Sequence, residues 1–292
     1  MVIAFSPGGP SDILSRLVGG KLSERLGQPF VFDNRPGAAG IIAAELVARA
    51  QPDGYTILYG HNGTHAIHAS LYKKLPYDPD KDFVPIVGVG YAPAVIFVHK
   101  DVPAKTLAEL IQLAKSKPGQ LRFGSSGVGS PQHITGEFFK VRYAVDITHI
   151  PYKGSAPALA DLSTGQIEVG FDYLIAAVSF VKSGSIRALA VCGPKRVEAL
   201  PGVPTAREAG LADFELGSWT GFFAPAKTPP DIIARLANEV DKTADSDERK
   251  QMASNLGLET LRMTQAEFAA FVRAETAKWA KLVKASGAQL EY

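Results

Sequence analysis

Short apolar segments alternate with amphipathic segments of helical periodicity along most of this chain. Residues 1–5 form an apolar run, and a helical stripe from Ile13 to Leu26 follows it and ends at Gly27. The same alternation resumes at residue 121 and continues to residue 191. Strands that alternate with helices favour a parallel sheet covered by helices. The sequence therefore predicts an α/β fold with a largely parallel sheet.

The chain length predicts two domains. A chain of 292 residues is long for one domain. The alternation stops at residues 84–90 and 93–98, which read as two apolar strands with little helix between them. Residues 214–224 read as a long extended segment. We expect these two places to be ordered crossings between the domains.

Composition and motifs exclude several classes of function. The net charge is +2, and no run of lysine and arginine forms the basic patch that a nucleic-acid binder needs. The glycines at 127 and 129 are followed by Gln132 where a dinucleotide fingerprint requires a third glycine, and no Walker sequence is present. The sequence predicts no cofactor and no nucleic-acid partner.

Two Gly/Ser-rich turns, at residues 5–12 and 123–133, carry the strongest indication of function. In each, an apolar run stops at small residues and a helical pattern begins. Such a turn directs backbone N–H groups and the positive end of a helix dipole toward one point, which favours an anion. Hydroxyl side chains on both turns favour a carboxylate. The alternative is that the glycines only permit tight turns.

Other polar residues have both structural and functional interpretations. His61, His65 and His68 resemble a metal-binding face, but no cysteine or nearby carboxylate completes the set, so we predict no metal site. Asp12 lies in the first turn of a helix, where a carboxylate caps the helix or complements its dipole. Asp172 either anchors a loop or contacts a ligand, and Trp219 is either a core residue or part of the site.

An enzyme is the alternative function. Ser126 and His133, with Asp172 as the acid, suggest a serine hydrolase, and the glycine-rich turn also suggests a transferase. The Gly-x-Ser-x-Gly spacing of a nucleophile elbow is absent, because Gly127 directly follows Ser126. We expect no catalytic residue, and hydrolase or transferase chemistry in the same cleft remains the alternative.

The sequence resembles the Bug-type, or TctC-like, extracytoplasmic solute receptors of tripartite tricarboxylate transport, over nearly its whole length. The segments that carry the resemblance are Phe5-Ser-Pro-Gly-Gly-Pro-Ser-Asp12, Asn34-Arg-Pro-Gly-Ala-Ala-Gly40, Ala50-Gln-Pro-Asp-Gly-Tyr-Thr56, Leu75-Pro-Tyr-Asp78 with Asp82-Phe83, Gly124-Ser-Ser-Gly-Val-Gly-Ser130 with His133, Pro151-Tyr-Lys-Gly154, and Trp219 with Ala224-Pro225.

This resemblance implies a two-lobed periplasmic-binding-protein fold, the type II Venus flytrap, with two crossings between the lobes. Lobe one would comprise residues 1–99 and 222–292, and lobe two residues 100–221. A small carboxylate-containing metabolite would bind in the cleft between them. The implied ligand-binding residues are Ser6, Gly8, Gly9, Pro10, Ser11 and Asp12 on one wall, Ser126, Gly127, Ser130 and His133 on the other, and Thr64, Asp172 and Trp219 at the distal end.

The resemblance also implies a partner and a location. The partner would be the membrane component of a tripartite tricarboxylate-type transporter, and the receptor would be a periplasmic monomer. Residues 1–5 already read as an interior strand, so we expect an upstream segment such as a removed signal peptide. Pro10 departs from the family pattern and removes one N–H donor from the first wall.

Overall fold

The computed structural model describes residues 1–8, 10–212 and 214–290. The strands are β1 (Val2–Ile3), β2 (Asp33–Asn34), β3 (Leu58–His61), β4 (Phe83–His99), β5 (Leu121–Ser125), β6 (Ile147–Pro151), β7 (Val169–Tyr173), β8 (Ile186–Val191), β9 (Gly217–Pro225) and β10 (Glu259–Thr260). The α-helices are α1 (Pro10–Leu26), α2 (Ile41–Ala48), α3 (His68–Leu71), α4 (Leu107–Ser116), α5 (Pro131–Tyr143), α6 (Ser155–Thr164), α7 (Leu174–Lys182), α8 (Pro230–Asp241), α9 (Asp247–Leu256) and α10 (Gln265–Ser286). Two short helical turns, η1 (Ala38–Gly40) and η2 (Gly63–Ile67), precede α2 and α3.

The strands form a mixed sheet, so the prediction of a largely parallel sheet is wrong. Their order is β2-β1-β3-β9-β4-β7-β5-β6, and β8 and β10 also pair with β4. The pairs among β1, β2 and β3 and among β5, β6 and β7 are parallel, as the alternation predicted. The long strands β4 and β9 run antiparallel to each other and to their other neighbours. These two strands run from one lobe toward the other, and the local alternation of strands and helices does not determine the direction of such crossings.

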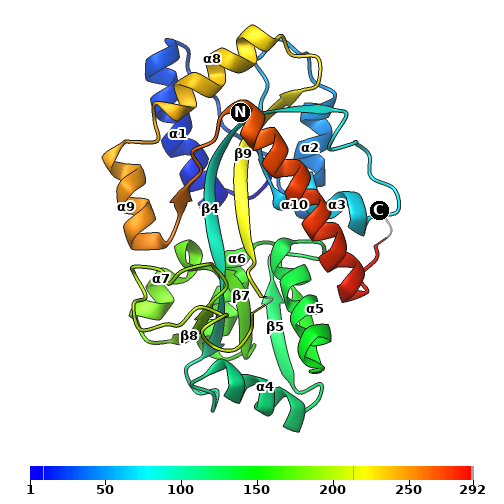
Figure 1. Cartoon of the computed structure of the whole chain (residues 1–292), viewed down its shortest axis with the longest axis vertical. Helices are drawn as coiled ribbons and strands as arrows, with labels where there is room; N and C mark the ends of the chain where they lie inside the picture. Colours follow the sequence, from blue (N-terminus) through cyan, green and yellow to red (C-terminus); the bar gives the residue numbers. More distant parts are fainter. Residues whose placement is uncertain (9, 213, 291–292) are drawn as a thin grey trace.

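The two lobes lie one above the other along the long axis of the molecule (Figure 1). The upper lobe carries α1, α2, α3, α8, α9 and α10, and the lower lobe carries α4 to α7. Strands β4 and β9 run from one lobe toward the other. This is the predicted two-lobed α/β architecture. The lobe boundaries given above remain a prediction.

Strand β4 is a single 17-residue strand where the sequence predicted two. It pairs with β9 as far as Pro93, opposite Gly217, and with β7 from Ala94, opposite Tyr173. A proline lacks the N–H that a ladder requires, so it is tolerated where a strand changes partners. Pro93 therefore marks the changeover between the two halves of β4 without ending the strand.

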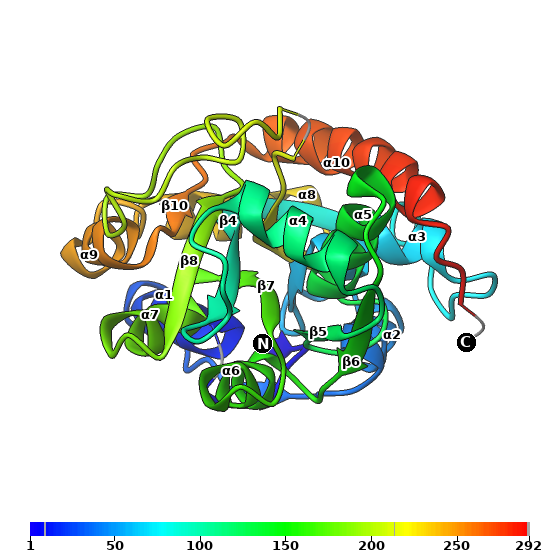
Figure 2. The ribbon, with the colours of Figure 1, turned by 90° about the horizontal axis from the view of Figure 1, so that it is seen from below.

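Each lobe buries both faces of its part of the sheet. In the lower lobe, Val95 and Phe97 pack with α6 and α7, whereas Ile96 and Val98 pack with the cluster that includes α4 and α5. Figure 2 shows the lower strands between these two pairs of helices. The alternation of side chains along a strand explains the two-sided core.

Local sequence signals set several helix boundaries. Capping boxes of Thr106 with Glu109 and of Thr264 with Glu267 begin α4 and α10. Within the described residues, no helix combines the length and the apolar character needed to cross a bilayer.

Candidate functional site

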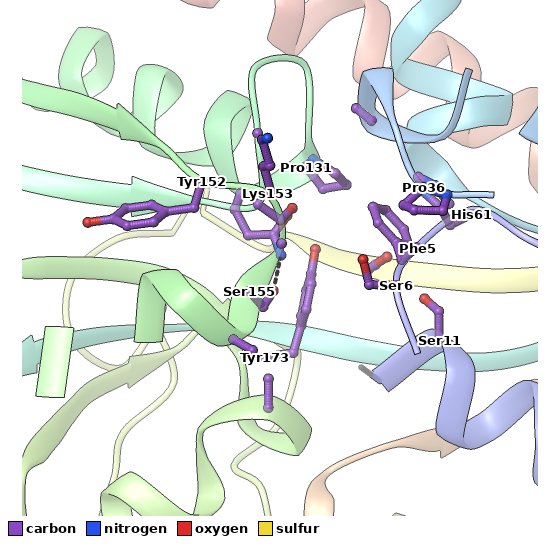
Figure 3. A pocket seen from close by; sticks show the side chains of 18 of the residues that line it. Phe5, Ser6, Ser11, Pro36, His61, Pro131, Tyr152, Lys153, Ser155 and Tyr173 are labelled. Atoms are coloured by element: carbon purple, nitrogen blue, oxygen red, sulfur yellow. Dashed lines mark hydrogen bonds between the residues drawn. The ribbon is translucent and has the colours of Figure 1, made fainter. Parts of the chain in front are cut away.

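A cavity of about 1130 Å³ lies between the lobes. Its walls come mainly from segments that directly follow strands: residues 5–8 after β1, residues 36–39 after β2, residues 126–128 after β5 and residues 152–157 after β6. Tyr173 adds a wall where β7 meets α7. Figure 3 shows these side chains converging from both lobes. Open α/β sheets place ligands outside the carboxyl ends of their strands, and this cavity occupies that position.

The first predicted wall lies at the start of α1. Ser6, Gly8 and Ser11 line the cavity. Pro10 is the first residue of α1, and Gly9 lies outside the described residues. The hydroxyl groups of Ser6 and Ser11 therefore reach the cavity from the N-terminal side of a 17-residue helix. This end of the helix carries the positive pole of its dipole.

Asp12 holds this wall together from behind the cavity surface. Its Oδ2 accepts a hydrogen bond from the Gly8 amide at 2.9 Å, and its Oδ1 accepts from Arg16 Nε and Asn34 Nδ2, both at 2.9 Å. Burial raises the pKa of Asp12, but the hydrogen bonds from Arg16, Gly8 and Asn34 outweigh it and lower the pKa overall. Asp12 is not among the described residues that line the cavity. The amide of Gly8 is already used by Asp12, so it is not the free donor that the sequence suggested.

The second predicted wall lies at the start of α5. Ser126 and Gly127 line the cavity, and Gly127 has a φ of 133°, a conformation that favours glycine. Ser130 is the N-cap of α5 and accepts from the amide of His133 at 3.3 Å. The sequence predicted Ser130 as a ligand contact, and the structure places it as a helix cap outside the cavity lining.

His133 is buried beneath this wall. Its Nδ1 accepts from the amide of Gly129 at 3.2 Å, and its ring stacks on His149 at 4.2 Å. Burial lowers the pKa of His133. The ring is therefore neutral at pH 7, and it does not line the cavity.

Ser126 and His133 do not form the nucleophile and base of a hydrolase in this structure. The hydroxyl of Ser126 donates to Oε1 of Gln132 at 2.9 Å, whereas Nδ1 of His133 is occupied by Gly129. A serine-histidine contact of 2.6 Å does join Ser125 Oγ and His149 Nε2. Ser125 is buried and is not part of the cavity lining, so this pair does not face the site.

Thr64, Asp172 and Trp219, the three residues expected at the distal end of the ligand, also lie outside the cavity lining. The hydroxyl of Thr64 donates to the carbonyl of His61 at 3.0 Å. Trp219 is fully buried, and its Nε1 donates to Oε2 of Glu275 at 3.1 Å. Asp172 lies directly beneath two cavity residues, Gln132 and Ser155, and accepts hydrogen bonds from both.

The three histidines after β3 are separately engaged. Nδ1 of His61 accepts from the Gly63 amide at 3.0 Å, the His65 ring stacks on Phe223 at 3.6 Å, and Nδ1 of His68 contacts Tyr77 Oη at 3.2 Å. No group of three metal-ligating side chains is found in the described part of the chain. Burial lowers the pKa of His61 to about 4, so this ring meets the cavity in its neutral form.

Several cavity residues were missed at the level of sequence. They are Gln132, Lys153, Ser155, Tyr173, His61 and the turn at residues 36–39. A usable signal was present, because each follows or ends a strand in the alternating pattern. Applying the strand-end rule to every strand would have nominated all of them except Gln132, which is the second residue of α5.

The turn after β2 is held in an unusual conformation. Ala38 and Ala39 have φ values of 44° and 51°, and Gly37 and Gly40 also have positive φ. Left-handed conformations at residues other than glycine cost roughly 1–3 kcal/mol each and cluster at ligand-binding sites. The strain therefore lies in a segment that forms part of the cavity wall.

The cavity favours an anion. Among the described residues that line it there is no aspartate or glutamate, and Lys153 is the one side chain that is charged at pH 7. The N-terminal ends of α1, α5 and α6 all border it. Helix N-termini and a lysine together create a positive potential for a negatively charged ligand.

A cavity between two α/β lobes that are joined by long strands defines a solute-binding receptor of the periplasmic-binding-protein type. A family comparison agrees: the sequence profile described as "Tripartite tricarboxylate transporter family receptor" matches residues 14–288. The chain belongs to this family. The resemblance predicted from the sequence motifs is thus confirmed.

Solved structures agree with this assignment. The chain is 39% identical to Rpa4515 of R. palustris, solved with adipate, with a TM-score of 0.94 and coverage of 99% of this chain and 97% of the other. It is 33% identical to the periplasmic binding protein BugD, with a TM-score of 0.92 and coverage of 100% and 98%. It is 35% identical to MatC (Rpa3494) of Rhodopseudomonas palustris, solved with bound malate, with a TM-score of 0.90 and coverage of 97% of each chain.

Proposed function

We propose that this receptor captures a small carboxylate-containing metabolite in the cavity between its lobes and delivers it to the membrane component of a tripartite tricarboxylate-type transporter. The observation that carries the proposal is the charge of the cavity: the described lining has one lysine and no carboxylate, and the N-termini of α1, α5, α6 and α7 border it. The two similar receptors solved with adipate and malate support a carboxylate ligand.

The ligand would be enclosed by movement of the lobes about β4 and β9. A cavity of about 1130 Å³ exceeds the roughly 300–1,000 Å³ typical of small-molecule sites. Hinge closure would reduce this space and remove water from the carboxylate. Strands β4 and β9 provide the two crossings in this proposal, and its lobe boundaries near residues 99 and 221 lie at the end of β4 and within β9.

The chain would act as a periplasmic monomer. Similarity to the periplasmic binding protein BugD supports the location. The closed form, with the ligand bound, would be the shape that the membrane partner recognises.

A receptor is favoured over a hydrolase or transferase. Ser126 is hydrogen-bonded to an amide oxygen, which cannot accept a proton as a general base does. Asp172 accepts hydrogen bonds from Gln132, Ser155 and the Tyr173 amide, and none of these partners is a histidine.

The test is a thermal-shift screen of the purified chain against mono-, di- and tricarboxylates, aromatic acids and acidic amino acids, with chemical analysis of each compound afterwards. The proposal predicts a rise in melting temperature that grows with concentration, and recovery of the compound unchanged. Conversion of a compound that binds would support the enzyme alternative. No shift with any carboxylate would contradict the proposal.

A further inference from the structure

Four polar side chains form a connected hydrogen-bond chain in the lobe-two wall. Oγ of Ser126 donates to Oε1 of Gln132 at 2.9 Å. Nε2 of Gln132 donates to Ser155 Oγ at 3.1 Å and to Asp172 Oδ1 at 3.3 Å. Oγ of Ser155 donates to Asp172 Oδ1 at 3.2 Å. Ser126, Gln132 and Ser155 line the cavity, and Asp172 is buried behind them.

Asp172 sets the direction of every bond in this chain. An ionised carboxylate only accepts hydrogen bonds, and the Tyr173 amide also donates to Oδ1 at 2.8 Å. Burial raises the pKa of Asp172 to about 6, so the carboxylate is ionised above neutral pH. It therefore attracts the amide nitrogen of Gln132, and the amide oxygen must point toward Ser126.

The two hydroxyl groups consequently have no proton left for a ligand. A serine hydroxyl has one proton and two acceptor lone pairs. The proton of Ser126 is used by Gln132, and the proton of Ser155 is used by Asp172. At the cavity surface, these two oxygens present only lone pairs. The lone pairs repel a carboxylate and accept hydrogen bonds from a ligand donor.

Resting on the proposed function, we propose that lobe two selects ligands with a hydrogen-bond donor, a hydroxyl or ammonium group, beside the carboxylate, and that Ser126 and Ser155 accept from this donor. The carboxylate itself is held by the hydroxyl groups of Ser6 and Ser11 in lobe one. The favoured ligand class is therefore hydroxy or amino acids, over unsubstituted acids of the same length.

The free-energy cost of leaving Ser126 and Ser155 without a donor determines how strongly the site discriminates between the two classes of ligand. A site built to hydrogen-bond a ligand group discriminates strongly against an analogue that lacks the group, because buried polar atoms are then left unpaired. Even one such bond worth about 1.4 kcal/mol corresponds to a tenfold difference in Kd.

The experiment is isothermal titration at pH 8 with matched acids of four and six carbons: succinate, 2-hydroxysuccinate and 2-aminosuccinate, and adipate, 2-hydroxyadipate and 2-aminoadipate. We expect at least one hydroxy or amino acid to bind about tenfold or more tightly than its unsubstituted partner. Comparing the hydroxy acid with the amino acid of each length shows whether the preferred donor is a hydroxyl or an ammonium group.

Three variants locate the effect, each checked by its melting temperature. Ser126→Ala and Ser155→Ala each remove one acceptor, so we expect the preference for the donor-bearing acid to fall at least threefold in at least one of them. Ser11→Ala, on the other wall, is the matched control, and we expect it to weaken binding of substituted and unsubstituted acids by the same factor.

The outcomes separate the two proposals. Equal binding of substituted and unsubstituted acids, or a preference unchanged in both Ser126→Ala and Ser155→Ala, would overturn the donor inference and leave the receptor function in place. Failure of all six acids, and of the wider carboxylate panel, to bind would overturn both.

Discussion

The backbone amide of Gly8 donates a hydrogen bond to Oδ2 of Asp12 at 2.9 Å, so the loop that forms the first wall of the cavity is fastened to the helix that follows it. The other carboxylate oxygen of Asp12 accepts from Arg16 and Asn34. One buried carboxylate therefore joins the loop, the helix and the neighbouring strand β2. The residue acts on the ligand through the position of Ser6 and Gly8.

The first prediction concerns this anchor. Asp12→Ala leaves the amide of Gly8 without its acceptor and removes one of the two acceptors of Asn34 Nδ2, which keeps the Phe5 carbonyl, so we expect the free energy of unfolding to fall by about 1–3 kcal/mol. Carboxylate affinity should fall as well, because the loop is no longer held. Urea unfolding and titration calorimetry measure the two effects. Arg16→Met, which leaves the Gly8 contact intact, is the control, and an equal loss in both variants would contradict the anchoring role.

The second prediction concerns Trp219. Trp219→Phe removes the hydrogen bond to Glu275, to which Trp279 Nε1 and Lys278 also donate. Bonds to charged groups contribute about 1.5–3 kcal/mol, so the variant should be less stable by a comparable amount. Ligand affinity should remain within about twofold, a change of roughly 0.4 kcal/mol. A tenfold loss of affinity with unchanged stability would instead place Trp219 at the ligand.

The third prediction concerns the lysine of the cavity. Lys153 is exposed, so its attraction to a bound carboxylate is screened and should contribute about 0.2–1 kcal/mol. Lys153→Gln should weaken binding by up to about fivefold and reduce its dependence on salt. Lys115→Gln, on the exposed face of α4, should change neither. Identical salt dependence in wild type and Lys153→Gln would show that this lysine does not contact the anion.

The fourth prediction concerns acid. Burial lowers the pKa of His61 to about 4 and that of His68 to about 3, both below the unfolded value of 6.5. The unfolded chain therefore binds more protons between pH 6.5 and these values, and stability falls as the pH falls through that window. Each histidine contributes at most about 1.4 kcal/mol per pH unit.

His68→Gln tests this effect. Unfolding free energies measured at pH 7.5, 6.0 and 5.0 should decrease less steeply in the variant, by about the contribution of one histidine. His68 does not line the cavity, so the slope reports on folding. A slope equal to that of wild type would contradict the assignment of His68 as a buried neutral ring.

The sequence predicted the parts of the fold that depend on local pattern. The strand-to-helix turns before α1 and α5 were predicted because small residues between an apolar run and a helical stripe indicate a tight turn. The family resemblance nominated Ser6, Ser11 and Ser126 within these turns, and the structure brings all three to the cavity surface.

The remaining features depend on tertiary contacts that no local pattern records. The sequence predicted two strands, at residues 84–90 and 93–98, but a change of partner at Pro93 allows β4 to run through both as one strand. Asp12 and Asp172 had both structural and functional interpretations from the sequence, and only the structure shows which residues each of them holds in place. The direction of the Gln132 amide follows from Asp172, which is 40 residues away in the chain.

The most direct test of the central claim is calorimetric titration of a carboxylate that stabilises the wild-type chain, repeated with Ser126→Trp, whose indole would fill the cavity from the lobe-two wall. The account predicts one binding site, recovery of the ligand unchanged, and at least a hundredfold loss of affinity in a variant that melts near the wild-type temperature. Wild-type affinity in Ser126→Trp, or chemical conversion of the ligand, would contradict it.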